Sequence, residues 1–435
     1  MRVLFLSDVY FPRINGVSTS IATFRADLAA SGIETTLVAP EYAPLSRQAA
    51  PAGEAAGAAE AADVAEGIVR VKAAGVPGDP EDRRMRWKPL RRALDRLTVE
   101  RFDLIHVHTP FIALYAGTGH ARRQRIPCVA TWHTHFEEYL HQYVPVLPRP
   151  IGRTLARSFT RSQARRLDAL IAPSAPMRDI LERYRVAAPV HVVPTGLSPD
   201  RFARADGARF RARLGVRPEQ PLLLYVGRVA YEKNIEFLIR CFARVRLAAP
   251  DAVFVIAGEG PAEGALQRFV RRLGLEAAIR FTGYLDRERT LLDCYAAADV
   301  FVFASRTETQ GLVLLEAMAQ GAPIVSTAAL GTRSILKRES GAIVVPEREK
   351  EFAAAILRVL QSAELRRDIA SRGRAYAESW SSRAMARRLA ALYRDIRAES
   401  DESSSLDWGV PSPDGDSDRF PVFDTEWVGA KSVRR

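Results

Sequence analysis

The amino-acid sequence predicts an α/β protein made of two doubly wound parallel-sheet domains that face each other across a cleft. Its 435 residues, 47% of them apolar, are enough for two domains with separate cores. Short apolar runs alternate with segments of helical period, and this alternation occurs twice along the chain. A stretch punctuated by Pro and Gly, residues 190–202, separates the two series. We therefore expect domains at 1–192 and 193–376, with a hinge near their boundary.

Each domain is expected to contain a Rossmann-like unit of buried parallel strands. In the first domain a helix at 18–31 follows the first strand. Such strands are buried on both faces, so they appear as continuous apolar, β-branched runs. The expected strands are 3–6, 35–39, 104–108, 128–131 and 169–172 in the first domain, and 222–226, 253–257, 279–282, 300–303 and 323–326 in the second.

Three further segments complete the expected organisation. Residues 377–398 are expected to form a helix that packs back on the first domain. Residues 399–435 are polar and weakly periodic, which predicts a disordered tail. Residues 45–67, rich in Ala, Gly and Glu, predict an inserted surface loop or a poorly packed helix. No run approaches the roughly 18 apolar residues of a membrane span, and the first residues are typical of a strand rather than a signal segment. We therefore expect a cytoplasmic protein.

The most informative motif follows the expected strand at 300–303. Glu308 and Glu316 are separated by seven residues, and the second falls in a helix expected to begin near Gly311. A helix N-terminus attracts phosphate, while carboxylates accept hydrogen bonds from sugar hydroxyls. The motif therefore suits a nucleotide-sugar, although a lone pair of glutamates at this spacing is also common by chance.

Basic residues and glycines follow the strands of the second domain. Gly227 and Arg228 come directly after its first strand, with Lys233 a few residues on. Ligands bind at the carboxyl ends of strands in open α/β sheets, and two fixed cations there would stabilise the charge on a departing diphosphate. Gly258 and Gly283 follow the next two strands, where glycine permits a tight turn or a close backbone approach.

A loop of the first domain is a second candidate for contact with phosphate. Asn15 and Gly16 lie between the first strand and the first helix. An Asn-Gly pair tolerates positive φ, and the helix N-terminus that follows can bind an anion. An ordinary strand-to-helix connection has the same spacing.

The side chains that could ligate a metal lack the spacing of a metal site. Three histidines and two glutamates fall within residues 133–141, but neither His-Glu-x-x-His nor another standard zinc pattern is present. Cys128, Cys241 and Cys294 are odd in number and widely separated, which fits reduced thiols. We expect no metal, no other cofactor and no disulfide.

Together these motifs resemble glycosyltransferase family 4, and the resemblance extends over nearly the whole chain. The Glu308 and Glu316 pair matches the donor-site signature of the family, and Arg228 and Lys233 match its basic pair. The resemblance implies the two-domain GT-B fold, with an acceptor-binding first domain and a nucleotide-sugar-binding second domain. It also implies a retaining, metal-independent transferase that forms an α-glycosidic bond.

The resemblance also implies roles for individual residues. His133 would contact the transferred sugar, positioning and polarising a hydroxyl, and Gly16 would approach the donor phosphate from the first domain. The residues expected to be catalytic are His133, Arg228, Lys233 and Glu308. The residues expected to bind the donor are Gly16, Gly227, Gly258, Gly283, Thr309, Gln310, Gly311, Leu312 and Glu316.

Two segments resemble one particular branch of this family. Residues 131–141 and 307–311 resemble bacterial 1,2-diacylglycerol 3-glucosyltransferases, which implies UDP-glucose as the donor and a diacylglycerol-type lipid as the acceptor. A GDP-mannose-dependent α-mannosyltransferase acting on a lipid or glycan remains an alternative. A non-catalytic nucleotide-sugar-binding or scaffold protein is disfavoured because the full set of motif residues is present.

The net charge of +12 is concentrated in one stretch of the first domain. Residues 83–185 contain 20 Lys or Arg and 8 Asp or Glu, which accounts for the whole excess. Within them, arginines recur every four residues from 149 to 165, on a helix with Ile151, Leu155 and Phe159 on another side.

This charge is expected to face the anionic lipids on the inner face of the cytoplasmic membrane. Each basic side chain near an anionic leaflet contributes on the order of 1 kcal/mol. Solvated helix faces are the alternative, and a nucleic-acid partner is not expected because no binding module accompanies the charge. The residues on the expected membrane and acceptor side are Arg86, Trp87, Arg153, Arg157 and Arg161.

Overall fold

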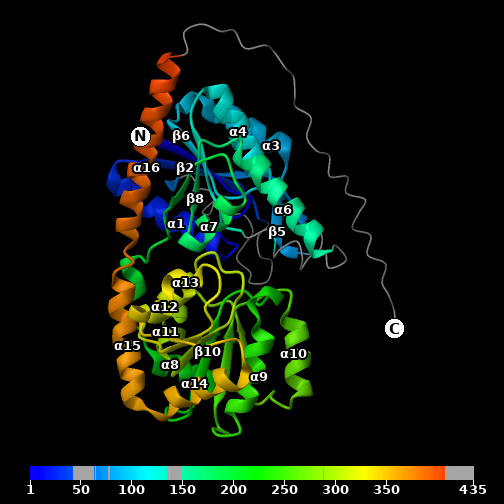
Figure 1. The fold of residues 1–435 in the computed structure, drawn as a ribbon, viewed down its shortest axis with the longest axis vertical. Coiled ribbons are helices and arrows are strands. Elements are labelled where there is room, and N and C mark those ends of the chain that lie inside the picture. The colour runs from blue at the N-terminus through cyan, green and yellow to red at the C-terminus, as the bar shows by residue number, and fades with distance from the viewer. Residues whose placement is uncertain are drawn as a thin grey trace, which may run out of the picture.

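Two parallel sheets, each covered by helices, form the framework of the computed structural model, and one sheet lies above the other in Figure 1. This confirms the predicted α/β fold of two Rossmann-like units. No described helix is long and apolar enough to cross a bilayer. The structure describes residues 1–42, 63, 65–76, 79–134, 137, 148–287 and 289–406.

The first sheet is built outward from its first strand. Its order is β3-β2-β1-β6-β7-β8-β9, and every pairing is parallel. The strand order reverses between β1 and β6, and ligands bind beside such a switch point in open α/β sheets. The strands are β1 (Arg2–Leu6), β2 (Glu34–Pro40), β3 (Ile68–Val71), β6 (Leu104–Val107), β7 (Cys128–Thr131), β8 (Ala169–Ala172) and β9 (Val190–Val192).

The second sheet repeats this plan. Its order is β12-β11-β10-β13-β14-β15, again with parallel pairing, and the order reverses between β10 and β13. The strands are β10 (Leu222–Val226), β11 (Val253–Ala257), β12 (Ile279–Gly283), β13 (Val300–Phe303), β14 (Ile324–Ser326) and β15 (Ile343–Val344).

Helices cover both faces of each sheet, because the parallel strands bury apolar side chains on both sides. A small antiparallel hairpin, β4 (Ala73–Val76) with β5 (Asp79–Met85), extends from the first domain. The helices of the first domain are α1 (Gly16–Leu28), α3 (Trp87–Leu97), α4 (Ile112–Gln124), α6 (Arg149–Ala164) and α7 (Ala175–Arg183). Those that follow are α8 (Gly207–Leu214), α9 (Ile235–Val245), α10 (Glu263–Arg272), α11 (Thr290–Ala296), α12 (Leu312–Ala319), α13 (Thr332–Ile335), α14 (Glu349–Gln361), α15 (Ala363–Glu378) and α16 (Ser382–Leu406).

The last helix, α16, completes the core of the first domain. Figure 1 shows α15 running along the second domain and α16 along the first. Met385, Leu389 and Tyr393 of α16 are buried in the same apolar cluster as Ile21 and Phe24 of α1. Helix α16 therefore stabilises the domain with which the chain begins.

The chain passes between the domains twice, and the two passages lie side by side. Val193 belongs to the core of the first domain and Leu197 to that of the second. Leu197 forms a parallel bridge with Ser381, in the break between α15 and α16. A Cβ at Gly196 would lie 2.5 Å from the backbone of Ser382, so glycine is required for this close approach.

Several elements differ from the sequence-based expectation. The strands β3, β9 and β15 and the hairpin were not predicted, because each is short or interrupted by polar residues. The predicted tail begins as helix, since α16 continues to Leu406. Residues 407–435 and most of 45–67 lie outside the described residues.

Candidate active site

A cavity of about 320 Å³ lies between the two domains and is lined by both. Its walls are loops that follow strands β1, β7 and β8 of the first domain and β10 to β13 of the second. These loops stand at the carboxyl ends of the strands, where open α/β sheets bind ligands. The volume is at the lower end of the range for small-molecule sites, about 300 to 1,000 Å³.

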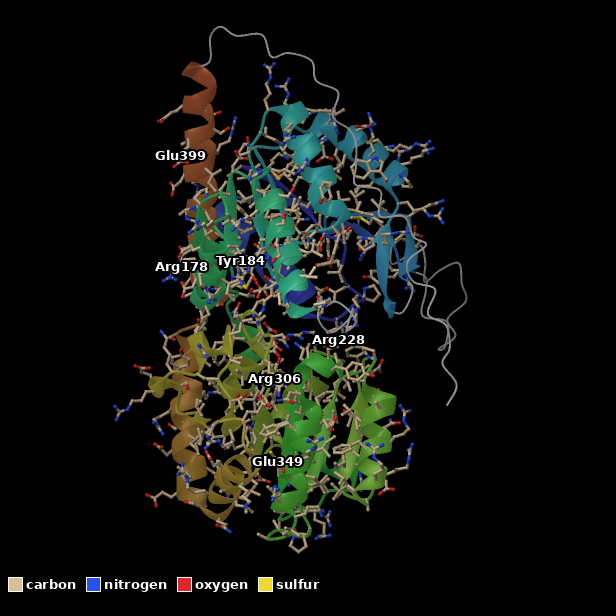
Figure 2. The ribbon with its side chains drawn as sticks, turned by 45° about the vertical axis from the view of Figure 1, so that its right-hand side comes forward. Arg178, Tyr184, Arg228, Arg306, Glu349 and Glu399 are labelled. Carbon is tan, nitrogen blue, oxygen red and sulfur yellow. The ribbon has the colours of Figure 1, made fainter. Side chains whose placement is uncertain are left out.

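Most of the site residues that the sequence suggested are brought together here. The four residues expected to be catalytic, His133, Arg228, Lys233 and Glu308, all line the cavity. Figure 2 shows Arg228 at the junction of the two domains. Among the expected donor-binding residues, Gly283 is absent from the lining, where its neighbour Tyr284 stands instead. The others, which do line it, are Gly16, Gly227, Gly258, Thr309, Gln310, Gly311, Leu312 and Glu316.

Lys233 and Glu308 form an ion pair in the cavity wall. Lys233 ends a short 3₁₀ helix after β10, and Glu308 lies in the loop after the adjacent strand β13. The Nζ atom of Lys233 donates to Oε1 of Glu308 at 2.6 Å. Nearby, the hydroxyl of Tyr225 donates to the carbonyl of Arg228 at 3.1 Å and so fixes the loop that carries Arg228. The pairing of β10 with β13 thus places both motifs at one point.

Glu316 is held by two groups deep in the site. Its side chain lies in α12, and the residue is 3% exposed. Its carboxylate accepts from Nη2 of Arg287 at 2.5 Å and from the hydroxyl of Tyr295 at 2.9 Å. Attraction to Glu316 raises the pKa of the Arg287 guanidinium, and burial raises that of the Tyr295 hydroxyl. Arg287 was not predicted as a site residue, because nothing in its spacing marks it.

Glycines allow the strand-end loops of the second domain to pack together. A Cβ at Gly258, where φ is 131°, would lie 2.1 Å from the carbonyl oxygen of Gly227. Gly311 has φ 100° at the start of α12. These positions require glycine for backbone reasons, which exist whether or not the same loops bind a ligand.

The N-terminus of α1 reaches the cavity from the first domain. Asn15 is extended, with φ −158°, so the positive φ that an Asn-Gly pair tolerates is not used here. Its side chain instead caps the helix by accepting from the Ser18 amide at 2.8 Å. A Cβ at Gly16 would meet no heavy atom of the described residues within 4 Å. Packing therefore gives no reason for a glycine at this position.

His133 stands at the end of a buried row of imidazoles. Its ring lies 5.8 Å from that of His108, which lies 4.0 Å from that of His106. The nitrogens of His106 contact the hydroxyls of Tyr393 at 2.5 Å and Thr131 at 2.7 Å. Burial lowers the pKa of His133 to about 4, so its imidazole is neutral near pH 7. No described residue hydrogen-bonds its buried Nε2 atom.

Asp8 is a buried carboxylate at the carboxyl end of β1. Its Oδ2 atom accepts from the hydroxyl of Thr109 at 2.8 Å and from the Ala113 amide at 3.1 Å. These bonds favour the ionised form, but burial outweighs them and raises the pKa of Asp8 to about 6. Asp8 was not predicted as a site residue from the sequence.

The residues expected on the membrane and acceptor side are not among those that line the cavity. The helix α6 forms as predicted, and Arg153, Arg157 and Arg161 are exposed along it. Ile151 and Leu155 are each 51% exposed rather than buried on another side, whereas Phe159 packs partly against the core.

The buried side of α6 is made of smaller residues, so Ile151 and Leu155 remain outside together with the arginines. Ala156, Thr160 and Ala164 occupy that buried side. Arg86 and Trp87, at the start of α3, are also exposed.

Part of the charge on α6 is compensated. Glu137 pairs with Arg157 at 2.8 Å and lies 3.9 Å from Arg153. The guanidinium of Arg157 also lies 5.5 Å from the ring centre of Tyr184. The basic surface is thus weaker than a count of arginines would indicate.

Neither a metal cluster nor a disulfide is found in the described part of the chain. No group of three or more His, Cys, Asp or Glu side chains could hold an ion there. Cys128, Cys241 and Cys294 are free and buried. Metal independence stays a prediction.

Comparisons with known proteins show which family this chain resembles. The family described as Glycosyltransferase Family 4 matches residues 14–201, and that described as Glycosyl transferases group 1 matches residues 206–376. The alpha-monoglucosyldiacylglycerol synthase of Streptococcus pneumoniae is 31% identical over 75% of this chain and 71% of its own.

Two further comparisons extend over more of the chain. A GDP-mannose-dependent phosphatidylinositol dimannoside mannosyltransferase of Mycobacterium tuberculosis is 28% identical, over 90% of this chain and 96% of its own. The structure of Anabaena HepE with UDP and glucose has a TM-score of 0.71 at 17% identity, over 91% of this chain and 100% of its own. The chain therefore belongs to glycosyltransferase family 4 and has the GT-B fold.

Proposed function

We propose that this transferase moves glucose from UDP-glucose to a diacylglycerol-type lipid, with retention and without a metal, to form an α-glycosidic bond. One observation carries the proposal: a single cavity between the domains is lined by Arg228, Lys233, Glu308, Glu316 and His133. Cations, carboxylates and a neutral imidazole in one site match the three parts of such a donor, namely its diphosphate, its hydroxyls and its transferred sugar.

In this proposal the diphosphate lies against Arg228 and Lys233, with the N-terminus of α1 at Gly16 facing it from the other domain. Negative charge grows on the leaving phosphate as the glycosidic bond breaks, and fixed cations and helix N–H groups stabilise it. Because these groups are in place before the reaction, little reorganisation is needed. They supply what a metal ion supplies in other transferases.

The carboxylates and His133 hold the sugars of the donor. Glu308 and Glu316 accept hydrogen bonds from donor hydroxyls, and each is held in place by an ion pair, with Lys233 and Arg287 respectively. His133, with a pKa of about 4, is a neutral group at pH 7. Its role is to orient a hydroxyl of the transferred sugar rather than to stabilise charge.

The lipid acceptor is expected to arrive from an anionic membrane at the cytoplasmic inner face. Ile151 and Leu155 are half exposed next to Arg153 and Arg157, and Trp87 lies exposed on α3. Apolar and basic side chains that are both exposed along one helix are typical of segments that lie in the membrane interface. Each apolar side chain contributes about 1 kcal/mol if half of its surface is newly buried.

Two assays separate the candidate functions. Purified protein is incubated with diacylglycerol vesicles and either labelled UDP-glucose or labelled GDP-mannose, and label in lipid is counted. The proposal predicts label from UDP-glucose, and faster transfer from GDP-mannose would replace it with the mannosyltransferase alternative. That alternative is kept because the mycobacterial mannosyltransferase matches 90% of this chain. No transfer from either donor, with nucleotide binding intact, would favour a non-catalytic binding protein.

A further inference from the structure

The side chain of Gln310 is fully engaged with the passage between the domains. It is 6% exposed and lies in the segment 305–311, here called the donor loop. Its Nε2 atom donates to the carbonyl of Thr195 at 2.6 Å, and its Oε1 atom accepts from the amide of Thr195 at 2.9 Å. A side-chain amide has one oxygen and one nitrogen, and both are bonded here to one residue.

Thr195 in turn is bonded to the first domain. It lies between Val193, in the first core, and Leu197, in the second. Its hydroxyl forms a buried hydrogen bond of 2.7 Å with the hydroxyl of Ser20 in α1. Ser20 is one helical turn beyond Gly16. Gly16 is the first residue of α1 and lines the cavity. A continuous path of hydrogen bonds thus runs from the donor loop to the helix that faces it.

A second link ties the donor loop to the first domain directly. The hydroxyl of Ser174, which caps α7, donates to the carbonyl of Thr309 at 2.6 Å. Neighbouring residues of the donor loop are therefore attached to the first domain by two independent routes.

We propose that Gln310 is a positioning residue, which fixes the donor loop relative to α1 through Thr195 and Ser20. Glu308 and the start of α12 lie on either side of Gln310, so the link sets where they stand relative to Gly16 and His133. This inference rests on the proposed transfer reaction, in which groups of both domains meet one donor. It gives Gln310 a role other than donor contact through its side chain.

The expected result follows from where each group lies. Arg228, Lys233 and Glu316 belong to the second domain, while Gly16 faces the diphosphate from the first, so nucleotide binding should depend on the link much less than transfer does. Transfer requires the two domains in register, and a misplacement of about 1 Å can cost about a hundredfold in rate. Gln310→Ala should therefore lower kcat by about tenfold to a hundredfold and change the Kd for UDP by less than about twofold.

A matched control is available in the same domain. Gln320 also donates from its side chain to backbone carbonyls, at Arg201 and at Ala203, but within the second domain. Gln320→Ala removes similar bonds without touching the interdomain link. It should lower stability to a similar extent and leave kcat near the wild-type value.

A distance measurement tests the inference without any assumption about substrate. Spin labels are attached at Asp179→Cys and Glu339→Cys, both exposed, while the native cysteines are buried. The distribution of distances between the labels should broaden in Gln310→Ala and stay unchanged in Gln320→Ala. An unchanged distribution in Gln310→Ala would overturn the positioning role, as would a Kd for UDP weakened in proportion to the loss of kcat.

A second variant tests the path itself. Ser20→Ala removes the far end of the link and leaves Gln310 bonded to Thr195, and it should broaden the distribution in the same way. The double variant should add little, because both changes interrupt one path. Additive effects would show that the two residues act separately and would refute the path. Broadening in a protein that transfers no glucose would refute the proposed substrate and leave the positioning role standing.

Discussion

The Nζ atom of Lys233 lies 2.6 Å from Oε1 of Glu308, so the cation proposed for the leaving phosphate is already paired with a carboxylate of the donor signature. The pair joins two loops that follow neighbouring strands, β10 and β13. It fixes the direction of both side chains before any donor arrives, which is the kind of preorganisation that electrostatic catalysis needs.

Loss of Lys233 should therefore act mainly on the rate of transfer. Lys233→Ala removes a cation at the leaving phosphate and releases Glu308, and kcat should fall by about 100-fold to 1,000-fold. Steady-state transfer kinetics measure this. Lys337→Ala, an exposed lysine of the same domain, is the control and should keep the wild-type rate. A loss below about threefold in Lys233→Ala would remove the lysine from the reaction.

Arg287 should be required for stability as well as for the shape of the site. Arg287→Met leaves the buried carboxylate of Glu316 with the Tyr295 hydroxyl as a neutral partner, and breaking a buried pair in this way costs about 3–5 kcal/mol. Denaturant unfolding should show the loss. The double variant Arg287→Met with Glu316→Gln should recover much of it, because no uncompensated charge remains. Equal stability of the wild type and the single variant would contradict the ion pair.

Asp8 should make the protein less stable as pH rises through the acid range. Its pKa is about 6 in the folded protein and 3.8 as a model group, so the folded state binds the proton more tightly. Stability from this group is present below about pH 4, declines as pH rises towards 6, and is lost above it, a change of about 3 kcal/mol.

The substitution Asp8→Asn removes this titration. The unfolding free energy of Asp8→Asn minus that of the wild type should become more positive between pH 4 and pH 7. Asp179→Asn, at an exposed carboxylate, is the control and should show little change. A difference for Asp8→Asn that is constant over this range would show that Asp8 does not titrate there.

Binding to anionic vesicles should depend on the exposed apolar residues of α6. Ile151→Ser with Leu155→Ser should weaken binding to anionic vesicles, measured by sedimentation, by about thirtyfold, since about 1 kcal/mol is lost at each position. Leu247→Ser, at a leucine 86% exposed on the second domain, is the control and should bind as the wild type does. Salt should weaken vesicle binding of the wild type and of the double serine variant alike, because both retain the arginines that attract the anionic lipids. If the wild-type protein does not bind anionic vesicles at low salt, this surface is not a membrane-binding surface.

The sequence was sufficient for the strand framework because continuous apolar runs mark buried parallel strands. All the predicted strands appear within one or two residues of their expected bounds. It was insufficient for β9 and β15, which have three and two residues and whose side chains are in part exposed. Such short strands form because a neighbouring strand is available for pairing. The local sequence pattern contains no information about that neighbour.

Arg228 and Lys233 were predictable as cavity residues, because they follow a strand and match the basic pair of the family. Arg287 and Tyr393 were not, because their importance comes from partners distant in sequence, Glu316 and His106. On α6, the helical period was correct but the side facing the core was not. Small residues such as Ala156 pack there, and larger apolar ones such as Ile151 stay outside.

The proposed transfer requires the cavity between the domains to bind a nucleotide-sugar through its cations. Calorimetric titration of UDP-glucose into the wild type and into Arg228→Ala tests it most directly. We predict binding to the wild type at one site per chain and a Kd at least about tenfold weaker in the variant, since a charge-assisted contact contributes about 1.5–3 kcal/mol. Equal affinity in the two proteins would show that Arg228 does not hold the donor and would place the donor elsewhere.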